Sequence, residues 1–316
     1  MRLGLGQSLN ASHDIVYRFL DIYPNAVGAY STRKLSHSYT GYALTVRETA
    51  SGNNWEADIG FQSDGSVGAN SPIFNATGAP ADATTLSDFA NSGDLHVKTW
   101  FDQTGGTSAT KGTASEQPKI MSSGTLVTQG SNNQAALDFD GSDDELQIAD
   151  SDAFSFTDGS GTDKPISMFI TYDLEETTNG RIILSKDEGG SAREWTWYFD
   201  GSDQRFYLKS GGGGNQQSYD GDNVGTGLQV GTMLYTGSES YTGIQFYKNG
   251  SAASMVDGQN QTYSGMSNTS APVRISNRYT GSSLNSKISE IIVYDTAQAT
   301  NRTAIETNIN NHFGVY

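Results

Sequence analysis

The sequence contains no cysteine, which excludes disulfide bonds, a thiolate nucleophile and thiolate metal ligands. Basic residues are also few: 19 lysines and arginines stand against 35 aspartates and glutamates, so the formal net charge at pH 7 is −16. A surface of this sign repels phosphate backbones and anionic lipids. We therefore expect no nucleic-acid partner and no insertion into a membrane.

Long apolar runs are absent too. The first residues carry no apolar stretch of signal-peptide length, and no later stretch is long and apolar enough to span a bilayer. The motifs of nucleophile elbows, Walker loops and dinucleotide-binding turns do not occur. The histidines lack the spacing of metal ligands, at His13, His37, His96 and His312. We expect no cofactor, and calcium is the one ion that the sequence leaves open.

Turn-forming and strand-forming residues are abundant. There are 37 glycines, 16 tyrosines and 13 phenylalanines, which is typical of short strands joined by many turns. Strand patterns are clearest over residues 166–172 and 287–294. Asn249-Gly250 predicts a two-residue hairpin turn, because both residue types tolerate positive φ. Apolar residues recur at helical spacing over residues 304–313 and Gly314 follows, so the sequence predicts an all-β fold with a short C-terminal helix.

Aromatic residues alternate along residues 195–199, which places Trp195 and Trp197 on one face of a strand. Aromatic rings flanked by amides suit neutral glycans, because sugars stack on ring faces. The candidate saccharide-binding residues are Trp195, Trp197, Gln216 and Tyr219, with Tyr198, Tyr207 and Tyr241 as further ring faces. The alternative is that the two tryptophans face the interior, as aromatic residues on one face of a strand usually do.

Acidic residues are concentrated in segment 138–145. Carboxylate oxygens are the ligands that Ca²⁺ prefers, and Asp140, Asp143 and Asp144 are the candidate ligands. Gly141 comes too early for an EF-hand loop. The alternative is a purely structural turn between two strands.

Residues 1–28 are predicted to form an extension ahead of a single body of residues 29–316. Pro24 ends the only patterned stretch of this extension. Its apolar residues are predicted to dock either onto the body or onto a partner, and the candidate anchoring residues are Leu5, Ile15, Phe19 and Ile22.

Several motifs follow one another in the second half. They are Leu137-Asp138-Phe139-Asp140-Gly141, the strand pattern at 166–172, Phe246-Tyr247-Lys248-Asn249-Gly250, Val273-Arg274-Ile275 and the pattern at 288–295. Their order resembles the concanavalin-A-like or laminin-G-like superfamily over about residues 135–316. This resemblance is specific for the fold and poorly specific for a ligand.

The first half carries a second set of motifs, at residues 29–35, 39–41, 43–47 and 99–105. They resemble the N-terminal half of the arabinofuranosidase catalytic sandwich, with Phe-Asp-Gln-Thr-Gly at 101–105 where that family has Tyr-Asp-Gln-Ser-Gly. The same pattern is common in virion proteins of tailed bacteriophages, often behind a short leader. Together the two resemblances imply one concanavalin-A-like (jelly-roll) β-sandwich over residues 29–316.

The resemblance also bears on catalysis. Retaining glycosidases need two carboxylates about 5–5.5 Å apart. The resemblance implies that the first would lie at Asp187, Glu188 or Glu194, and the second within residues 276–280, which contain no acid. The paired cysteines of that family are also missing. We therefore expect no enzymatic activity.

These observations predict a non-catalytic surface protein of a phage virion, either a capsid decoration or head fibre or a tail adhesin. Its expected partners are other virion proteins and host surface glycans, and subunit packing over exposed strand edges favours a homo-oligomer. The alternatives are a glycoside hydrolase of the arabinofuranosidase type and a bacterial carbohydrate-binding module.

Overall fold

The computed structural model describes residues 18–49, 51–158, 160–177, 180–201, 203–210, 216–221, 224–260, 262–279 and 281–316. Antiparallel strands dominate this part of the chain, and its α-helices are α1 (Phe19–Ile22), α2 (Leu86–Ala90) and α3 (Arg302–Phe313). The prediction of an all-β fold with a short C-terminal helix is confirmed. Of the helices described, none has the length and apolar character needed to cross a membrane.

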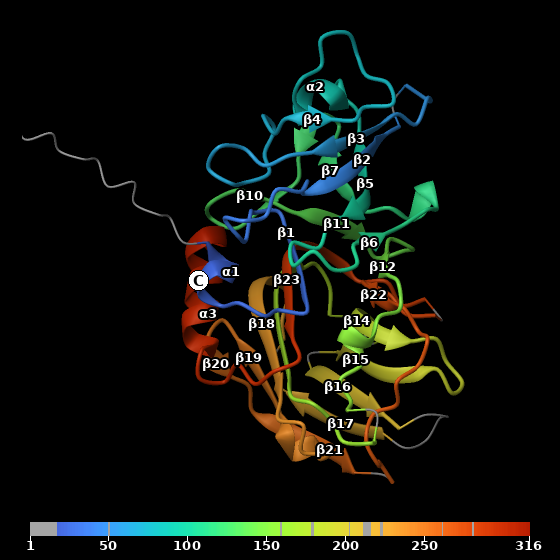
Figure 1. Cartoon of the computed structure of the whole chain (residues 1–316), viewed down its shortest axis with the longest axis vertical. Helices are drawn as coiled ribbons and strands as arrows, with labels where there is room; N and C mark the ends of the chain where they lie inside the picture. The colour runs from blue at the N-terminus through green and yellow to red at the C-terminus, as the bar shows by residue number, and fades with distance from the viewer. Residues whose placement is uncertain are drawn as a thin grey trace, which may run out of the picture.

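Two layers of strands form the lower part of the molecule in Figure 1. The central strand of the first layer is β13 (Ile166–Leu174), which pairs with β18 (Gly227–Tyr235) on one side and β23 (Asn285–Tyr294) on the other. The layer is completed by β19 (Ile244–Lys248) beside β18, and by β1 (Gly28–Ser31) and β11 (Leu137–Asp140) beside β23.

The second layer has three neighbouring strands at its centre, β14 (Arg181–Asp187), β15 (Arg193–Asp200) and β16 (Asp203–Lys209). It continues beyond β16 through β17 (Gln216–Gly221) and β21 (Met255–Asn260). Beyond β14 it continues through β22 (Val273–Ile275), β12 (Leu146–Ile148) and β6 (Ala109–Thr110).

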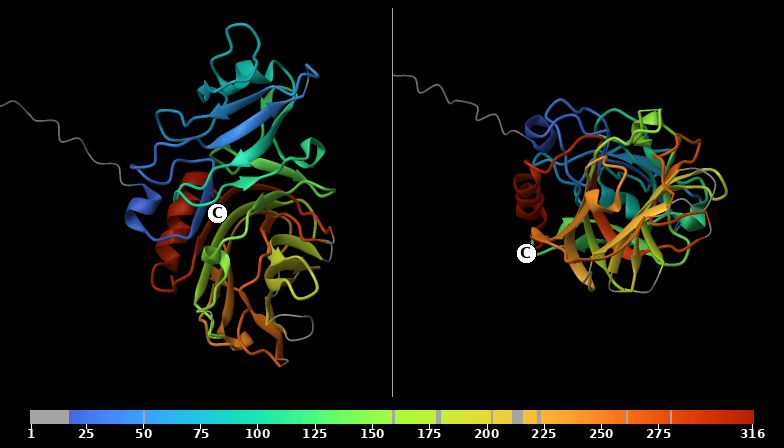
Figure 2. Two further views of the ribbon diagram at one scale, coloured as in Figure 1. Left: turned by 45° about the vertical axis from the view of Figure 1, so that its right-hand side comes forward. Right: turned by 90° about the horizontal axis from the view of Figure 1, so that it is seen from below.

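A smaller lobe of strands stands above the two layers (Figure 2, left). Its strands are β2 (Leu44–Glu48), β3 (Glu56–Ile59), β4 (Ile73–Phe74), β5 (Leu95–Trp100), β7 (Lys119–Ser122) and β8 (Thr125–Leu126). The lobe joins the layers because β5 pairs with β6 and β7 pairs with β11. The remaining short elements are β9 (Thr128–Gln129), β10 (Gln134–Ala135), β20 (Ser251–Ala252) and the 3₁₀ turns at Ala114–Glu116, Asp152–Phe154 and Tyr241–Gly243.

The first layer is buried on both faces, which explains why β13 reads as a nearly continuous apolar run. Met168 and Ile170 belong to the large core shared with the second layer, whereas Phe169 belongs to a smaller core on the opposite face. Helix α3 covers that opposite face with Ile305 and Ile309. Successive side chains of a strand point to opposite faces, so one strand contributes to both cores.

The N-terminal extension is partly built into the body. Phe19 is 2% exposed and belongs to the smaller core, with the guanidinium of Arg33 lying 5.6 Å from the centre of its ring. Of the two predicted options, Phe19 docks onto the body, and its assignment as an anchor to a partner is corrected because its ring already packs against its own chain. Ile22 is 48% exposed and stays available, while Leu5 and Ile15 lie outside the described residues.

Candidate functional site

The central strands of the second layer present two different faces. Trp195 and Trp197 are 1% and 0% exposed and belong to the large core. Their indole N–H groups donate to the backbone oxygen of Phe154 and to the side chain of Gln204. Both rings are thus enclosed and offer no face to a sugar, which corrects their assignment as saccharide-binding residues in favour of the core alternative.

Two other predicted saccharide-binding residues lie on β17, beside β16. Gln216 is opposite Lys209 in the strand register, and Tyr219 is opposite Gly258 of β21. The side chains of Gln216 and Tyr219 lie outside what the structure describes, so their assignment stays a prediction.

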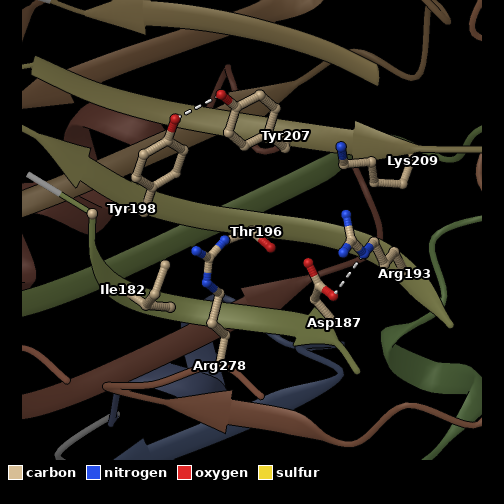
Figure 3. A pocket seen from close by; sticks show the side chains of 9 residues that line it. Ile182, Asp187, Arg193, Thr196, Tyr198, Tyr207, Lys209 and Arg278 are labelled. Carbon is tan, nitrogen blue, oxygen red and sulfur yellow. Dashed lines mark hydrogen bonds and ion pairs between the residues drawn. The ribbon is translucent and has the colours of Figure 1, made fainter. Parts of the chain in front are cut away.

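The face opposite the core carries a hollow of about 280 Å³ (Figure 3). It is lined by Gly180, just before β14, and by side chains from β14, β15 and β16 and from the loop after β22: Ile182, Asp187, Arg193, Thr196, Tyr198, Tyr207, Lys209 and Arg278. Thr196 is opposite Tyr207 in the strand register, and Asp187 is opposite Arg193, so cross-strand pairing fixes which side chains meet. We call this site the hollow.

One side of the hollow is an aromatic pair. The rings of Tyr198 and Tyr207 are stacked, with centroids 5.1 Å apart and planes 9° from parallel. Their hydroxyl oxygens are hydrogen-bonded at 2.7 Å. Burial raises the pKa of Tyr198 above its usual value, so the phenol stays protonated and can take part in hydrogen bonding at neutral pH.

The opposite side of the hollow is charged. Asp187 forms an ion pair with Arg193 at 3.4 Å and also accepts the backbone N–H of Gly189 at 2.7 Å. Arg193 additionally donates to the hydroxyl of Tyr279 at 2.6 Å. Lys209 lies with its ammonium group 5.2 Å from the centre of the Tyr207 ring. These contacts hold the charged groups around the hollow rather than in open solvent.

The carboxylates at the first position implied by the arabinofuranosidase resemblance are separated by the strand geometry. Glu194 is completely buried, 2.9 Å from Nζ of Lys186. Glu188 pairs instead with Arg274. Among the described residues lining the hollow, Asp187 is the only carboxylate, and the segment 276–280 contributes Arg278 where the second acid would lie.

The predicted calcium ligands come together on the turn after β11. One carboxylate oxygen from each of Asp140, Asp143 and Asp144 lies within 4.8 Å of the other two. Such a group of oxygens fits a hard cation. Burial, with the neighbouring Asp140, raises the pKa of Asp144 to about 7.

The same turn is also braced by its own hydrogen bonds. The backbone N–H of Ser142 donates to Asp140 at 2.8 Å, and the backbone N–H of Asp140 donates to Asp144 at 3.1 Å. The geometry therefore accommodates both predicted roles, a calcium site and a structural turn.

No protein-family profile matches the chain, and no curated protein sequence matches it. Among solved structures, the chain is similar to a GH54 α-L-arabinofuranosidase soaked with a cyclic sulfate inhibitor, at 12% identity and a TM-score of 0.60, over 93% of this chain and 64% of that one. It is also similar to an arabinofuranosidase complexed with arabinofuranosyl-α-1,2-xylobiose, at 13% identity and a TM-score of 0.59, over 91% and 63% of the two chains.

A structure of botulinum neurotoxin type C, whose cell entry depends on interaction with two ganglioside molecules, overlaps less. Its TM-score is 0.40 and its identity 9%, over 58% of this chain and 41% of that one. The chain spans less than two thirds of the length of each of these structures. At such identities the likeness to the arabinofuranosidases shows a common β-sandwich fold and nothing finer.

Proposed function

We propose that this protein is a non-catalytic saccharide-binding β-sandwich and that the hollow over β14, β15 and β16 is its binding site. The observation that carries the proposal is the combination of a stacked tyrosine pair with polar groups on one small concave surface. Aromatic rings with a polar edge suit sugars, which present both C–H faces and hydroxyl groups.

The size of the hollow limits what it can bind. Its volume of about 280 Å³ is just below the range of roughly 300–1,000 Å³ that is typical of small-molecule sites. We therefore expect it to hold one sugar unit of a longer chain. Because most of its side chains project from paired strands, the site is largely formed before the ligand arrives, which reduces the entropy lost on binding.

The carboxylates support a binding role over hydrolysis. Glycoside hydrolysis uses two carboxyl groups on either side of the scissile bond. Asp187 stands alone among the described residues of the hollow and is ion-paired with Arg193. Glu194, the other implied acid on this sheet, is turned into the interior towards Lys186.

A glycoside hydrolase remains the second candidate, because the two arabinofuranosidases share the fold over more than nine tenths of this chain. A screen of aryl arabinofuranosides decides between the two. We expect no turnover above the buffer rate. A hydrolase would be established if the wild type turns over a substrate and a folded variant does not. The variants to test are Asp187→Asn, Glu188→Gln and Glu194→Gln.

Substitution of Tyr207 tests saccharide binding directly. A glycan array identifies a ligand, and titration calorimetry then compares wild type with Tyr207→Ala. Loss of the ring should weaken binding by about 1 kcal/mol, or roughly five-fold in Kd. Tyr207→Phe keeps the ring and should lose less, while Tyr316→Ala removes a tyrosine that is 54% exposed outside the hollow and should lose nothing. Equal Kd values for all four proteins would place the site elsewhere.

We infer further that the sandwich is displayed on the particle of a tailed bacteriophage, as a capsid decoration, head fibre or tail adhesin. The motifs at residues 29–47 and 99–105, which resemble those of phage virion proteins, support this placement. Its partners would then be other virion proteins, host surface glycans and further copies of the same chain. Antibody raised against residues 29–316 should label purified particles in electron micrographs, and unlabelled particles would contradict a virion role.

A further inference from the structure

The hollow has a charge opposite to that of the protein as a whole. The chain has a formal net charge of −16, yet the described lining of the hollow holds three cationic side chains and a single carboxylate. Asp187 forms its ion pair with Arg193 and not with Arg278. A positive excess gathered in one small concavity of an acidic protein favours an anionic ligand.

Arg278 is the cation that most needs a partner. Its side chain is half-buried and projects into the hollow from the loop after β22 (Figure 3). Within the described part of the chain, its guanidinium makes no hydrogen bond and no ion pair, and its Nε atom is buried without an acceptor. Buried N–H donors are normally paired, so the Nε of Arg278 lacks an acceptor.

Lys209 approaches the same space from β16. Burial and the nearby positive charge of Arg193 and Arg278 lower the pKa of Lys209, although the negative charge of Asp187 opposes this shift. The cations of the hollow therefore repel one another, and a bound anion would relieve that repulsion. Arg193 already contacts Asp187 and Tyr279. We therefore assign it a role in positioning neighbouring side chains, not in binding the anion.

We propose that the hollow recognises an acidic saccharide, a sugar unit bearing a carboxylate or another oxyanion, through the fork of Arg278 and the ammonium group of Lys209. This inference rests on the proposed function, because it names the class of saccharide for the same site. The planar guanidinium matches the two oxygens of a carboxylate or the oxygens of a sulfate or phosphate. Tyr198 and Tyr207 then contact the ring that bears the anion.

The test compares matched ligands. Oligosaccharides of a uronic acid, the same oligosaccharides with the carboxyl groups reduced to alcohols, and sulfated neutral oligosaccharides are titrated against the full-length protein. We expect the wild type to bind at least one acidic arm about ten-fold or more tightly than the reduced one. Comparison of the uronic acid with the sulfated oligosaccharide shows which oxyanion the hollow prefers, carboxylate or sulfate. Raising the salt concentration should weaken acidic binding and leave the reduced arm unchanged.

Variants assign the preference to residues. Arg278→Gln should abolish most of the acidic preference, because it should weaken binding of the acidic oligosaccharide far more than binding of the reduced one. Arg278→Lys keeps the positive charge but lacks the planar guanidinium, so it should retain only part of the acidic preference. The matched control is Lys164→Gln, which removes a cation whose side chain is 42% exposed away from the hollow, and it should behave as wild type.

The possible failures are distinguishable. If wild type binds the reduced and acidic arms equally, or if Arg278→Gln keeps the preference, this inference is overturned while saccharide binding stands. If none of the arms binds and a glycan array also stays blank, the proposed function itself fails and the inference fails with it.

Discussion

Replacing Lys186 with methionine would test the most deeply buried ion pair of the sheet that carries the hollow. Lys186 and Glu194 both have fully buried side chains, and Nζ lies 2.9 Å from Oε1 of Glu194. Nζ also lies 2.7 Å from the more exposed Asp150 and donates to the backbone oxygen of Ala271 at 2.8 Å. Methionine resembles the lysine stem in volume, so the change removes a charge and its donors without opening a large cavity.

The expected loss follows from the group left behind. Removing one partner of a buried ion pair costs about 3–5 kcal/mol, because the other charge stays buried. Glu194 keeps two hydrogen bonds from Thr269, at 2.7 and 2.8 Å, while its Oε2 atom has no partner among the described residues. We therefore expect the free energy of unfolding to fall by about 3 kcal/mol at pH 8.

The loss should depend on pH in a defined direction. Burial raises the pKa of Glu194, and removal of Lys186 should raise it further. A carboxyl whose pKa is higher in the folded state than in the unfolded state favours folding most at low pH, and that contribution is lost as pH rises through the folded value. The destabilisation by Lys186→Met should therefore be smaller at pH 5 than at pH 8.

Urea unfolding at the two pH values measures this effect. The control is Lys98→Met, whose ion pair with Glu56 is on the surface and should contribute less than about 1 kcal/mol. Adding Glu194→Leu to Lys186→Met should recover most of the loss. If Lys186→Met instead costs under about 1 kcal/mol at both pH values, the pair with Lys186 is not what stabilises the buried Glu194 carboxyl.

The remaining predictions concern the acidic turn and the N-terminal segment. Because burial raises the pKa of Asp144 from its usual 3.8 to about 7, the folding contribution of this carboxyl is lost as pH rises through 7. With calcium chelated, Asp144→Asn should stabilise the protein by about 2 kcal/mol at pH 8 and by little at pH 4, as measured by thermal unfolding. An equal effect at both pH values would contradict the raised pKa of Asp144. Added Ca²⁺ should raise the Tm of wild type at pH 8 but not that of Asp144→Asn; an unchanged wild-type Tm would leave the turn purely structural. Deleting residues 1–17 should abolish particle association, and persistent association would contradict the anchor. Phe19→Ala should lower the free energy of unfolding by about 3 kcal/mol in urea.

Local signals in the sequence were sufficient for several elements. Asn249 and Gly250 have φ values of 49° and 79° between β19 and β20, which confirms the predicted turn. Helix α3 ends before Gly314, whose φ is 64°, as predicted from the apolar spacing over residues 304–313 and the glycine that follows. These features depend on backbone preferences of neighbouring residues, and such preferences act over a few positions only.

The face of each strand that packs against the core, and the contacts between distant segments, could not be predicted in the same way. Alternation divides β15 into two faces but does not fix which one meets the core, so the sequence left Trp195 and Trp197 between a saccharide site and the core, where the structure places them. Tyr198 of β15 and Tyr207 of β16, which the sequence offered as further ring faces, line the hollow. Glu194 departs from simple alternation, because the register shift opposite Lys186 leaves it without a strand partner.

Local sequence patterns also could not predict that the loop after β22 brings Arg278 to the hollow. Arg278 is about 70 residues after Lys209 in the chain and reaches the hollow only because β22 pairs with β14. No periodicity or motif marks either residue as part of one site. A cluster of this kind becomes apparent only once the strand order is known.

The central claim is that the hollow binds a saccharide without cleaving it. Saturation-transfer NMR tests this in one sample, with the best array ligand incubated overnight with the full-length protein. We predict transfer to the ligand from wild type, much weaker transfer from Tyr207→Ala, and a ligand spectrum unchanged at the end. Equal transfer from both proteins, or the appearance of free reducing sugar, would contradict the account.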